Sequence, residues 1–298
     1  MDSLITNLLT RFKRADISIR FIYINTLLFL LYSVVAIVAL LANKEWGGEI
    51  AHYLCLPSSP RLLLLRPWTL ITYMFFHTGF WHILFNMLWL YWFGQLFLRL
   101  FSTRHFITLY LLGGIAGGLF YILAYNIFPY FKEIESVSYL LGASASVLAI
   151  VTATAVREPD YRVGLLFIGS VKLKYIAIFT ILLSFLFIGS SNAGGNIAHL
   201  GGAFGGWLFA WLLGKGYDIT AWMNGLYNFF SRPFKGVGRR RRPKMKAYRT
   251  DRTQEYDYNA RKRDQEMEIN RILEKLKRSG YSSLSDEEKK RLFDAGKR

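Results

Sequence analysis

The sequence contains a single cysteine, Cys55, among its 298 residues, and only 19% of its residues are charged. One cysteine excludes an intramolecular disulfide and a cysteine-cluster metal site. The few charges are also unevenly distributed, because five long stretches contain none: 21–43, 67–98, 105–131, 136–156 and 175–214. Apolar stretches of more than about 18 uncharged residues are typical of membrane spans. This distribution excludes a soluble globular enzyme and a disordered chain.

The five stretches predict six membrane spans, because about 20 residues are needed to cross the hydrocarbon core. Pro67 and the turn at Thr78-Gly79 separate an interfacial segment, 67–78, from the second span. The polar, glycine-rich segment 190–196 divides the last stretch into two spans, whereas the apolar segment 163–171 is too short to cross. The predicted spans are about 21–43, 80–100, 106–128, 136–156, 173–189 and 195–214.

Basic residues mark one side of the membrane. They lie in the N-terminal segment 1–20, in the loop after the second span and in the loop after the fourth. The positive-inside rule therefore predicts that both termini are cytoplasmic. The predicted fold is an all-α membrane bundle of six helices over 21–214. The first span is too long for a signal core and has no small-residue cleavage site after it, so no cleaved signal peptide is expected.

The segment 215–298 differs in composition from the rest, since it carries 23 of the 37 lysines and arginines. Its run Arg239–Lys244 could bind nucleic acid, but a cytoplasmic segment near a membrane is expected to bind anionic lipid head groups instead. We therefore expect no nucleic-acid partner. Helical composition up to Ser279 and a capping box from Ser285 to Glu288 predict a small helical hairpin at about 259–294.

The uncharged stretches restrict the chemistry that the bundle can perform. They offer no pair of aspartates for a membrane aspartic protease and no His-Glu-x-x-His for a zinc protease. The lack of a carboxylate also disfavours a proton-coupled transporter. His82, Asn86, Ser144 and His199 remain, each near the outer end of its span and about 5–15 Å deep at the helical rise. The other histidines lie outside this layer: His52 in the first outer loop, His77 before the second span and His105 at a cytoplasmic end.

These four residues fit one chemistry. A serine hydroxyl such as that of Ser144 becomes a nucleophile when an imidazole such as His199 accepts its proton. His82, Asn86 and the backbone N–H of Ser144 can donate to a developing oxyanion. No cofactor or metal is needed. A packing explanation remains open, because small residues such as those at 142–146 allow helices to approach, and a histidine can form an interhelical hydrogen bond.

Three motifs resemble those of the rhomboid family of intramembrane serine proteases. The segment His82–Trp89 resembles the family's second-helix motif, Gly142–Ala145 its nucleophile motif, and Ala198–Gly206 its sixth-helix motif. Arg66-Pro67-Trp68 resembles the tryptophan–arginine region of the first loop, although the order differs. The resemblance covers about 20–214 and implies a six-helix rhomboid-like bundle. The helical tail resembles extensions of some bacterial members, and the compact core suggests a bacterial inner membrane.

The resemblance implies a role for each matching residue. Ser144 would attack the peptide carbonyl, and His199 would act as general base and then as general acid. His82 and Asn86 would form the oxyanion site with the Ser144 backbone. The supporting glycines Gly142 and Gly202 would allow close approach at the nucleophile turn and between the fourth and sixth spans. The substrates would be transmembrane proteins that arrive laterally near the fifth span and are cleaved near the outer membrane face, typically after a small residue.

The sequence departs from the family pattern at two positions. Ala145 stands where glycine is usual, which predicts an extra methyl group beside the oxyanion site. Leu148 stands where many members have an aromatic ring against the histidine. Two other functions are alternatives: a catalytically silent rhomboid-like protein that binds or escorts membrane clients, and a small-molecule transporter. The first would normally lack Ser144 or His199, and the second would need a polar path through both leaflets.

Overall fold

The computed structural model describes residue 6 and residues 10–133, 138–165, 169–221 and 252–295. Contacts divide the chain into two compact units, 1–233 and 234–298, which are treated separately. Among the described residues of the first unit, four helices are long and apolar enough to cross a membrane: α2 (Ile17–Leu41), α6 (Phe80–Leu100), α7 (Thr103–Ile127) and α10 (Ala193–Gly214). Two further apolar helices are shorter, α8 (Ser144–Arg157) and α9 (Leu173–Leu186).

Six helices thus lie where six spans were predicted, but length and composition support only four as full crossings. The largest difference concerns the fourth span, predicted over 136–156, because its helix begins only at Ser144. The predicted cytoplasmic position of both termini stays a prediction. The described residues of the apolar segment 163–171 lie in two antiparallel strands, β3 (Arg162–Leu165) and β4 (Gly169–Lys172), so the fold is mostly rather than wholly helical.

The outer surface of the bundle is apolar, as expected for a protein surrounded by lipid. Helix α2 shows this most clearly, because only 11% of its most apolar window is buried. Its exposed aliphatic side chains are Ile24, Leu27, Leu28, Leu30, Leu31, Val34, Val35, Ile37, Val38, Leu40 and Leu41. In water such a surface would promote aggregation, whereas in a bilayer it is solvated by acyl chains. The helices therefore indicate an integral membrane protein.

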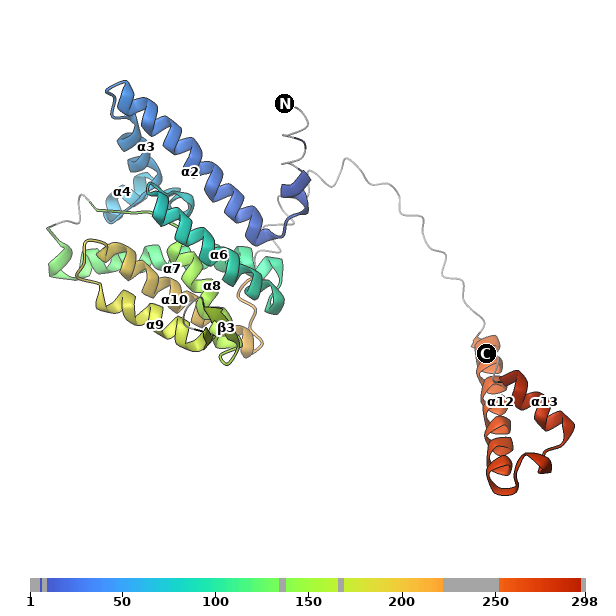
Figure 1. Cartoon of the computed structure of the whole chain (residues 1–298). Coiled ribbons are helices and arrows are strands. Elements are labelled where there is room, and N and C mark those ends of the chain that lie inside the picture. Colours follow the sequence, from blue (N-terminus) through green and yellow to red (C-terminus); the bar gives the residue numbers. More distant parts are fainter. Residues whose placement is uncertain (1–5, 7–9, 134–137, 166–168, 222–251, 296–298) are drawn as a thin grey trace. The chain divides into compact units, whose positions relative to one another are not determined.

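Helix α8 is the centre of the bundle and packs against α6, α7, α9 and α10 (Figure 1). All of its residues from Ala145 to Ala155 are buried. Glycines on α7 and α10 allow this close packing, because any side chain at these positions would overlap α8. A Cβ at Gly113 of α7 would lie 2.3 Å from the Ala149 Cβ, and a Cβ at Gly206 of α10 would lie 2.2 Å from the Ala149 carbonyl oxygen. Small residues thus bring α7, α8 and α10 into backbone contact.

The segment between α2 and α6 forms a folded loop of short elements. In chain order these are α3 (Trp46–Leu54), β1 (Leu56–Pro57), α4 (Pro60–Leu65), α5 (Thr69–Thr72) and the 3-10 helix η1 (Tyr73–Phe75). Arg66 and Trp68 hold this loop together, since Arg66 donates to the His52 carbonyl (3.0 Å) and the Trp68 indole to the Tyr53 carbonyl (2.9 Å). These two bonds therefore join the part of the loop around α3 to the part that precedes α5.

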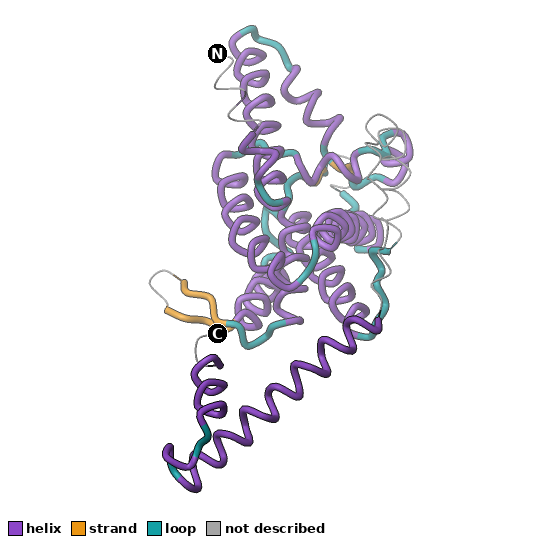
Figure 2. Tube along the Cα trace, turned by 90° about the vertical axis from the view of Figure 1, so that its right-hand side faces the viewer, coloured by secondary structure: helices purple, strands orange, loops and turns teal. Residues whose placement is uncertain are grey.

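Two small antiparallel sheets lie at opposite ends of the bundle (Figure 2). Strand β1 pairs with β2 (Tyr139–Leu140), with Leu56 opposite Leu140, which links the first loop to the residues just before α8. At the other end, Asp160 accepts from Lys172 (2.8 Å) and Lys174 (2.9 Å) beside the β3–β4 hairpin. These two lysines lower the pKa of Asp160 to about 2.

The part of the second unit that the structure describes, 252–295, contains two α-helices, α12 (Arg252–Ser279) and α13 (Asp286–Ala295), joined by the 3-10 helix η5 (Tyr281–Ser283). Their contact buries Ile272 and Leu284. The predicted capping box is present: the Ser285 backbone N–H donates to the Glu288 carboxylate (2.8 Å), and the Glu288 N–H donates to the Ser285 hydroxyl (3.3 Å). The basic run at 239–244, predicted to bind lipid head groups, lies outside the described residues.

Candidate active site

Ser144 is the first residue of α8, directly after a turn that the first loop holds in place. The Gly142 N–H donates to the Tyr73 carbonyl (2.8 Å), and the Ala143 N–H donates to Nε2 of His77 (3.3 Å). Both donors precede the helix, where backbone N–H groups have no intrahelical partner. The turn before Ser144 therefore has a fixed orientation.

The His77 side chain supports this turn through the hydrogen bond that its Nε2 accepts from Ala143. Its side chain is fully buried, and its ring centroid lies 5.1 Å from that of His82. Burial, and secondly the neighbouring His82, lower the pKa of His77 to about 3, so that the ring is neutral near pH 7. A neutral imidazole can accept a hydrogen bond at Nε2, which the contact with Ala143 requires. The sequence interpretation set His77 aside because it precedes the second span, and it missed this contact.

Gly142 permits the contact between the turn and His82. Its φ is +112°, in the region that favours glycine, and a Cβ there would lie 2.6 Å from Cε1 of His82. The imidazole therefore lies directly against the backbone that leads into Ser144. Asn86, one turn further along α6, donates from Nδ2 to the His82 carbonyl (2.8 Å). An amide nitrogen carries two hydrogens, so a second donor remains on Asn86.

His199 lies two turns into α10, which approaches α8 closely at Gly202. A Cβ at Gly202 would lie 2.2 Å from the Ala145 carbonyl oxygen. The Nδ1 atom of His199 lies 3.1 Å from the hydroxyl oxygen of Ser184, on α9. Sequence interpretation missed Ser184, although a signal was present: it lies four residues after Thr180 in the uncharged stretch 175–214.

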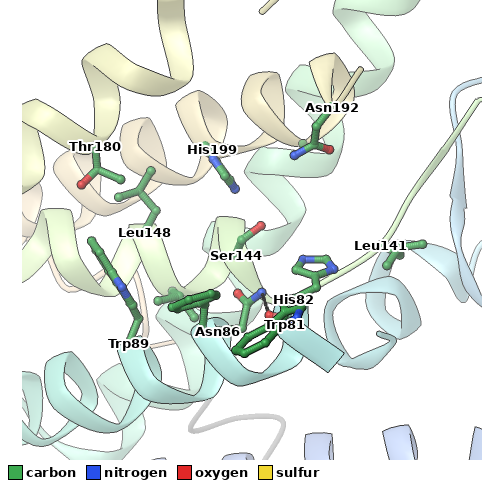
Figure 3. A pocket seen from close by; sticks show the side chains of 13 residues that line it. Trp81, His82, Asn86, Trp89, Leu141, Ser144, Leu148, Thr180, Asn192 and His199 are labelled. Atoms are coloured by element: carbon green, nitrogen blue, oxygen red, sulfur yellow. Dashed lines mark hydrogen bonds between the residues drawn. The ribbon is translucent and has the colours of Figure 1, made fainter. Parts of the chain in front are cut away.

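Of the residues predicted for the site, Ser144, His199, His82 and Asn86 line one cavity of about 380 Å³, whereas the supporting glycines Gly142 and Gly202 are not in its lining. Figure 3 shows the Ser144 hydroxyl and the His199 ring facing each other, with His82 and Asn86 on the α6 side. The full lining consists of Trp81, His82, Phe85, Asn86, Trp89, Leu141, Ser144, Val147, Leu148, Thr180, Asn192, Gly195 and His199. No direct hydrogen bond joins Ser144 and His199 in this structure. Such bonds are often long before a substrate is bound.

The predicted effect of Ala145 is corrected by the structure. Its methyl group points away from the cavity: a Cβ at Gly117 of α7 would lie 2.6 Å from the Ala145 Cβ, and Ala145 is only 1% exposed. Consecutive helical residues project about 100° apart, so a residue next to Ser144 faces another neighbour. Leu148, one turn after Ser144, does line the cavity (Figure 3).

A second cavity, of about 1190 Å³, lies between α6 and α9. Trp89 and Thr180 line both this groove and the cavity that contains Ser144. The groove is mostly apolar, with Trp92 and Phe179 on its walls and Arg99 among its few charged residues. The groove and the cavity thus lie next to each other, with Trp89 and Thr180 in the lining of both.

Two family models match the chain. The model described as the Rhomboid domain matches residues 65–216, just over half of the chain. The model described as a family of unknown function (DUF6576) matches residues 252–297, which contain the helical hairpin. The cavity residues thus all lie within the first match.

Two curated proteins are similar to part of the chain. The "RHOMBOID-like protein 12, mitochondrial" of Arabidopsis thaliana is 35% identical over 145 residues, which cover 45% of this chain and 43% of that protein. The "Rhomboid protein 1, mitochondrial" of Saccharomyces cerevisiae is 29% identical over 147 residues, or 48% of this chain and 41% of that protein. The chain thus spans less than half the length of either relative.

These relatives and the family match can be compared with the localisation and the family expected from the sequence. Both carry mitochondrial names, so they do not support the predicted bacterial inner membrane. The match over 65–216, together with the helices that can cross a membrane, supports the resemblance drawn from the three motifs. The chain belongs to the rhomboid family.

Proposed function

We propose that the protein is an intramembrane serine protease in which Ser144 is the nucleophile and His199 the general base. The observation that carries the proposal is the shared cavity into which both side chains point from different helices (Figure 3). Family membership supports the same reaction class. A packing role alone would not require these two polar groups to face one space.

The reaction starts when the Ser144 hydroxyl turns toward Nε2 of His199 and transfers its proton as Oγ attacks the peptide carbonyl. The carbonyl oxygen becomes an oxyanion. The free amide hydrogen of Asn86, the ring of His82 and the Ser144 N–H are its candidate donors. The protonated His199 then gives its proton to the departing amine, which leaves an acyl-enzyme that water hydrolyses. These roles are proposals for the four cavity residues.

The proposed substrate is a segment of another transmembrane protein. A helical peptide carbonyl is hydrogen-bonded to its own helix, so the segment must unwind before Ser144 can attack it. The groove between α6 and α9 supports lateral access, because it is apolar and shares Trp89 and Thr180 with the cavity. Cleavage near the outer membrane face is part of the same proposal. The bacterial inner membrane and lipid binding by the tail stay predictions.

The test is cleavage of a model transmembrane substrate by the purified full-length protein in liposomes. Ser144→Ala and His199→Ala are expected to abolish cleavage. Ser146→Ala is the matched control, because Ser146 is buried against Gly114 of α7 and does not line the cavity. Cleavage by Ser144→Ala at the wild-type rate would refute the assignment of the nucleophile.

A serine-reactive fluorophosphonate separates a wrong substrate from an inactive protein. Labelling of the wild type that is lost in Ser144→Ala but kept in Ser146→Ala would support an activated nucleophile even without cleavage. If neither cleavage nor labelling occurs, the protease assignment fails. The chain would then be better described as a rhomboid-like protein that binds membrane clients without cleaving them.

A further inference from the structure

Ser184 on α9 has a buried hydroxyl group that has no role in the reaction proposed above. Its side chain is 3% exposed. The hydroxyl oxygen lies 2.9 Å from the carbonyl oxygen of Thr180 and 3.1 Å from Nδ1 of His199. It therefore connects the backbone of α9 to the imidazole on α10.

The number of hydrogens decides the direction of both bonds. A serine hydroxyl carries one hydrogen, and a backbone carbonyl can only accept. The Ser184 hydrogen is therefore donated to the Thr180 carbonyl, in the i−4 bond that helical serines commonly form. With both contacts taken as hydrogen bonds, the Ser184 oxygen is left to accept, which places the hydrogen between Ser184 and His199 on Nδ1. In a neutral ring with Nδ1 protonated, Nε2 carries the lone pair.

This assignment fits the geometry at the other side of the ring. Nδ1 is turned toward α9, and the ring faces the Ser144 hydroxyl across the cavity (Figure 3). The opposite tautomer would place a hydrogen on Nε2, where a general base needs a lone pair. It would also leave Nδ1 and Ser184 as two acceptors facing each other, because the single Ser184 hydrogen is already bound by Thr180.

We propose that Ser184 is a positioning residue that holds His199 in the Nδ1-protonated tautomer, an inference that rests on the proposed protease function. Ser184 does not touch the reacting atoms and acts only through His199. No Asp or Glu occurs in α6, α7, α8, α9 or α10, so a neutral hydroxyl takes the orienting position that a carboxylate has in many serine proteases. The bond also makes the orientation of His199 depend on the position of α9.

The expected loss of catalytic rate follows from the fact that the Ser184 oxygen is an uncharged hydrogen-bond acceptor. When His199 becomes protonated in the transition state, the bond from Nδ1–H to the Ser184 oxygen becomes charge-assisted and strengthens. Loss of such a bond is expected to lower kcat about tenfold. It should leave KM almost unchanged, because Ser184 does not line the cavity.

The first test reads the tautomer directly and does not depend on activity. In protein labelled with ¹⁵N-histidine, the two ring nitrogens of a neutral imidazole have different shifts according to which one carries the hydrogen. The His199 signals, assigned by their loss in His199→Gln, are expected to report Nδ1–H in the wild type. Ser184→Ala is expected to give a mixture of tautomers, whereas Ser184→Thr keeps a hydroxyl and is expected to retain the wild-type pattern.

The second test measures kinetics in the same variants. Ser184→Ala is expected to lower kcat and the rate of fluorophosphonate labelling by about tenfold, and Ser184→Thr is expected to recover most of both. Thr154→Val is the matched control, since its buried hydroxyl makes the same i−4 bond to Ile150 (2.6 Å) but lies on α8 outside the cavity. Thr154→Val should have wild-type kinetics.

The outcomes distinguish the two proposals. An unchanged tautomer in Ser184→Ala, or an equal loss of rate in Thr154→Val, would overturn the role of Ser184 while leaving the protease assignment intact. A wild type that neither cleaves nor is labelled would overturn the protease function. In that case the ¹⁵N spectra would still decide whether Ser184 sets the tautomer of His199.

Discussion

The ring of His82 lies in the space that a side chain at Gly142 would need. A Cβ at Gly142 would be 2.6 Å from Cε1 and 2.7 Å from Nε2 of that ring. The φ of Gly142 is +112°, so the backbone there is also unfavourable for any residue with a Cβ. One glycine thus sets the turn before Ser144 and brings an imidazole against it.

Replacement of Gly142 by alanine should harm both folding and cleavage. We expect Gly142→Ala to lower the free energy of unfolding by about 2–3 kcal/mol, because the strained φ and the overlap with His82 each contribute. Cleavage should fall by at least about tenfold, since the ring or the turn must move at the proposed oxyanion site. Thermal unfolding in detergent and cleavage in liposomes measure the two effects.

The double variant Gly142→Ala/His82→Ala separates the two causes. Removal of the ring should relieve the overlap and recover part of the lost stability, but the cost of the positive φ should remain. Cleavage should not recover, because a proposed donor is then missing. If His82→Ala gives no additional stability in the Gly142→Ala background, the overlap is not a cause of the loss.

Asn86 offers a test of the oxyanion site with little effect on packing. Its amide is oriented by the bond to the His82 carbonyl (2.8 Å) and lines the cavity. We expect Asn86→Ala to lower kcat by about 10²-fold, the magnitude found when one oxyanion donor is removed. KM should change little, because the interaction is made in the transition state. A rise in KM at constant kcat would instead indicate that Asn86 binds the ground state.

The close approach of α8 and α10 can be tested at Gly202. A Cβ there would lie 2.2 Å from the Ala145 carbonyl oxygen, which is backbone and cannot rotate away. Gly202→Ala should therefore separate the helices that carry Ser144 and His199. We expect a loss of about 1–3 kcal/mol in unfolding free energy and a loss of cleavage, measured as for Gly142.

Gly205 is a control on the same helix. A Cβ at Gly205 would lie 3.3 Å from the Ala116 Cβ, a tight contact that a small shift can relieve. Gly205→Ala should keep most of the cleavage activity, since it faces α7 and not α8. Equal losses in the two variants would show that the sensitivity is general to α10 and not specific to the α8 contact.

The four residues proposed as nucleophile, base and oxyanion donors could be predicted from the sequence because the rise per residue of an α-helix is constant. Once the bounds of a span are known, the depth of each of its residues in the membrane follows from the residue number. His82, Asn86, Ser144 and His199 could therefore be placed at a similar depth. The length of α8 could not be obtained in this way. Uncharged composition marks the stretch 136–156, but it does not show that the chain becomes helical only at Ser144.

Ser184 and His77 were missed because their roles depend on contacts between residues that are far apart in the sequence. Ser184 lies 15 residues from His199, and His77 lies 66 residues from Ala143, so no local pattern relates either pair. The direction of the Ala145 methyl depends on the rotation of α8 about its own axis, which is set by packing against Gly117. Such rotations follow from the fit of several helices and not from the hydropathy of one.

His77 is expected to make stability depend on pH. Its pKa is lowered from 6.5 to about 3 in the folded protein, so below pH 6.5 the unfolded state binds more protons than the folded state. The stabilisation by neutral His77 is thus complete above about pH 6.5 and is lost as the pH falls toward 3. Between pH 6.5 and 5 the loss should be about 2 kcal/mol, at about 1.4 kcal/mol for each pH unit.

The variant His77→Gln isolates this contribution, because glutamine can accept from the Ala143 N–H but does not titrate. Thermal unfolding in detergent at pH 7.5 and at pH 5 should show a smaller drop for His77→Gln than for the wild type, by about 2 kcal/mol. The comparison uses the change with pH, so a lower starting stability of the variant does not affect it. If both proteins lose the same stability on acidification, His77 is not held neutral by burial, and its contact with the nucleophile turn must be explained otherwise.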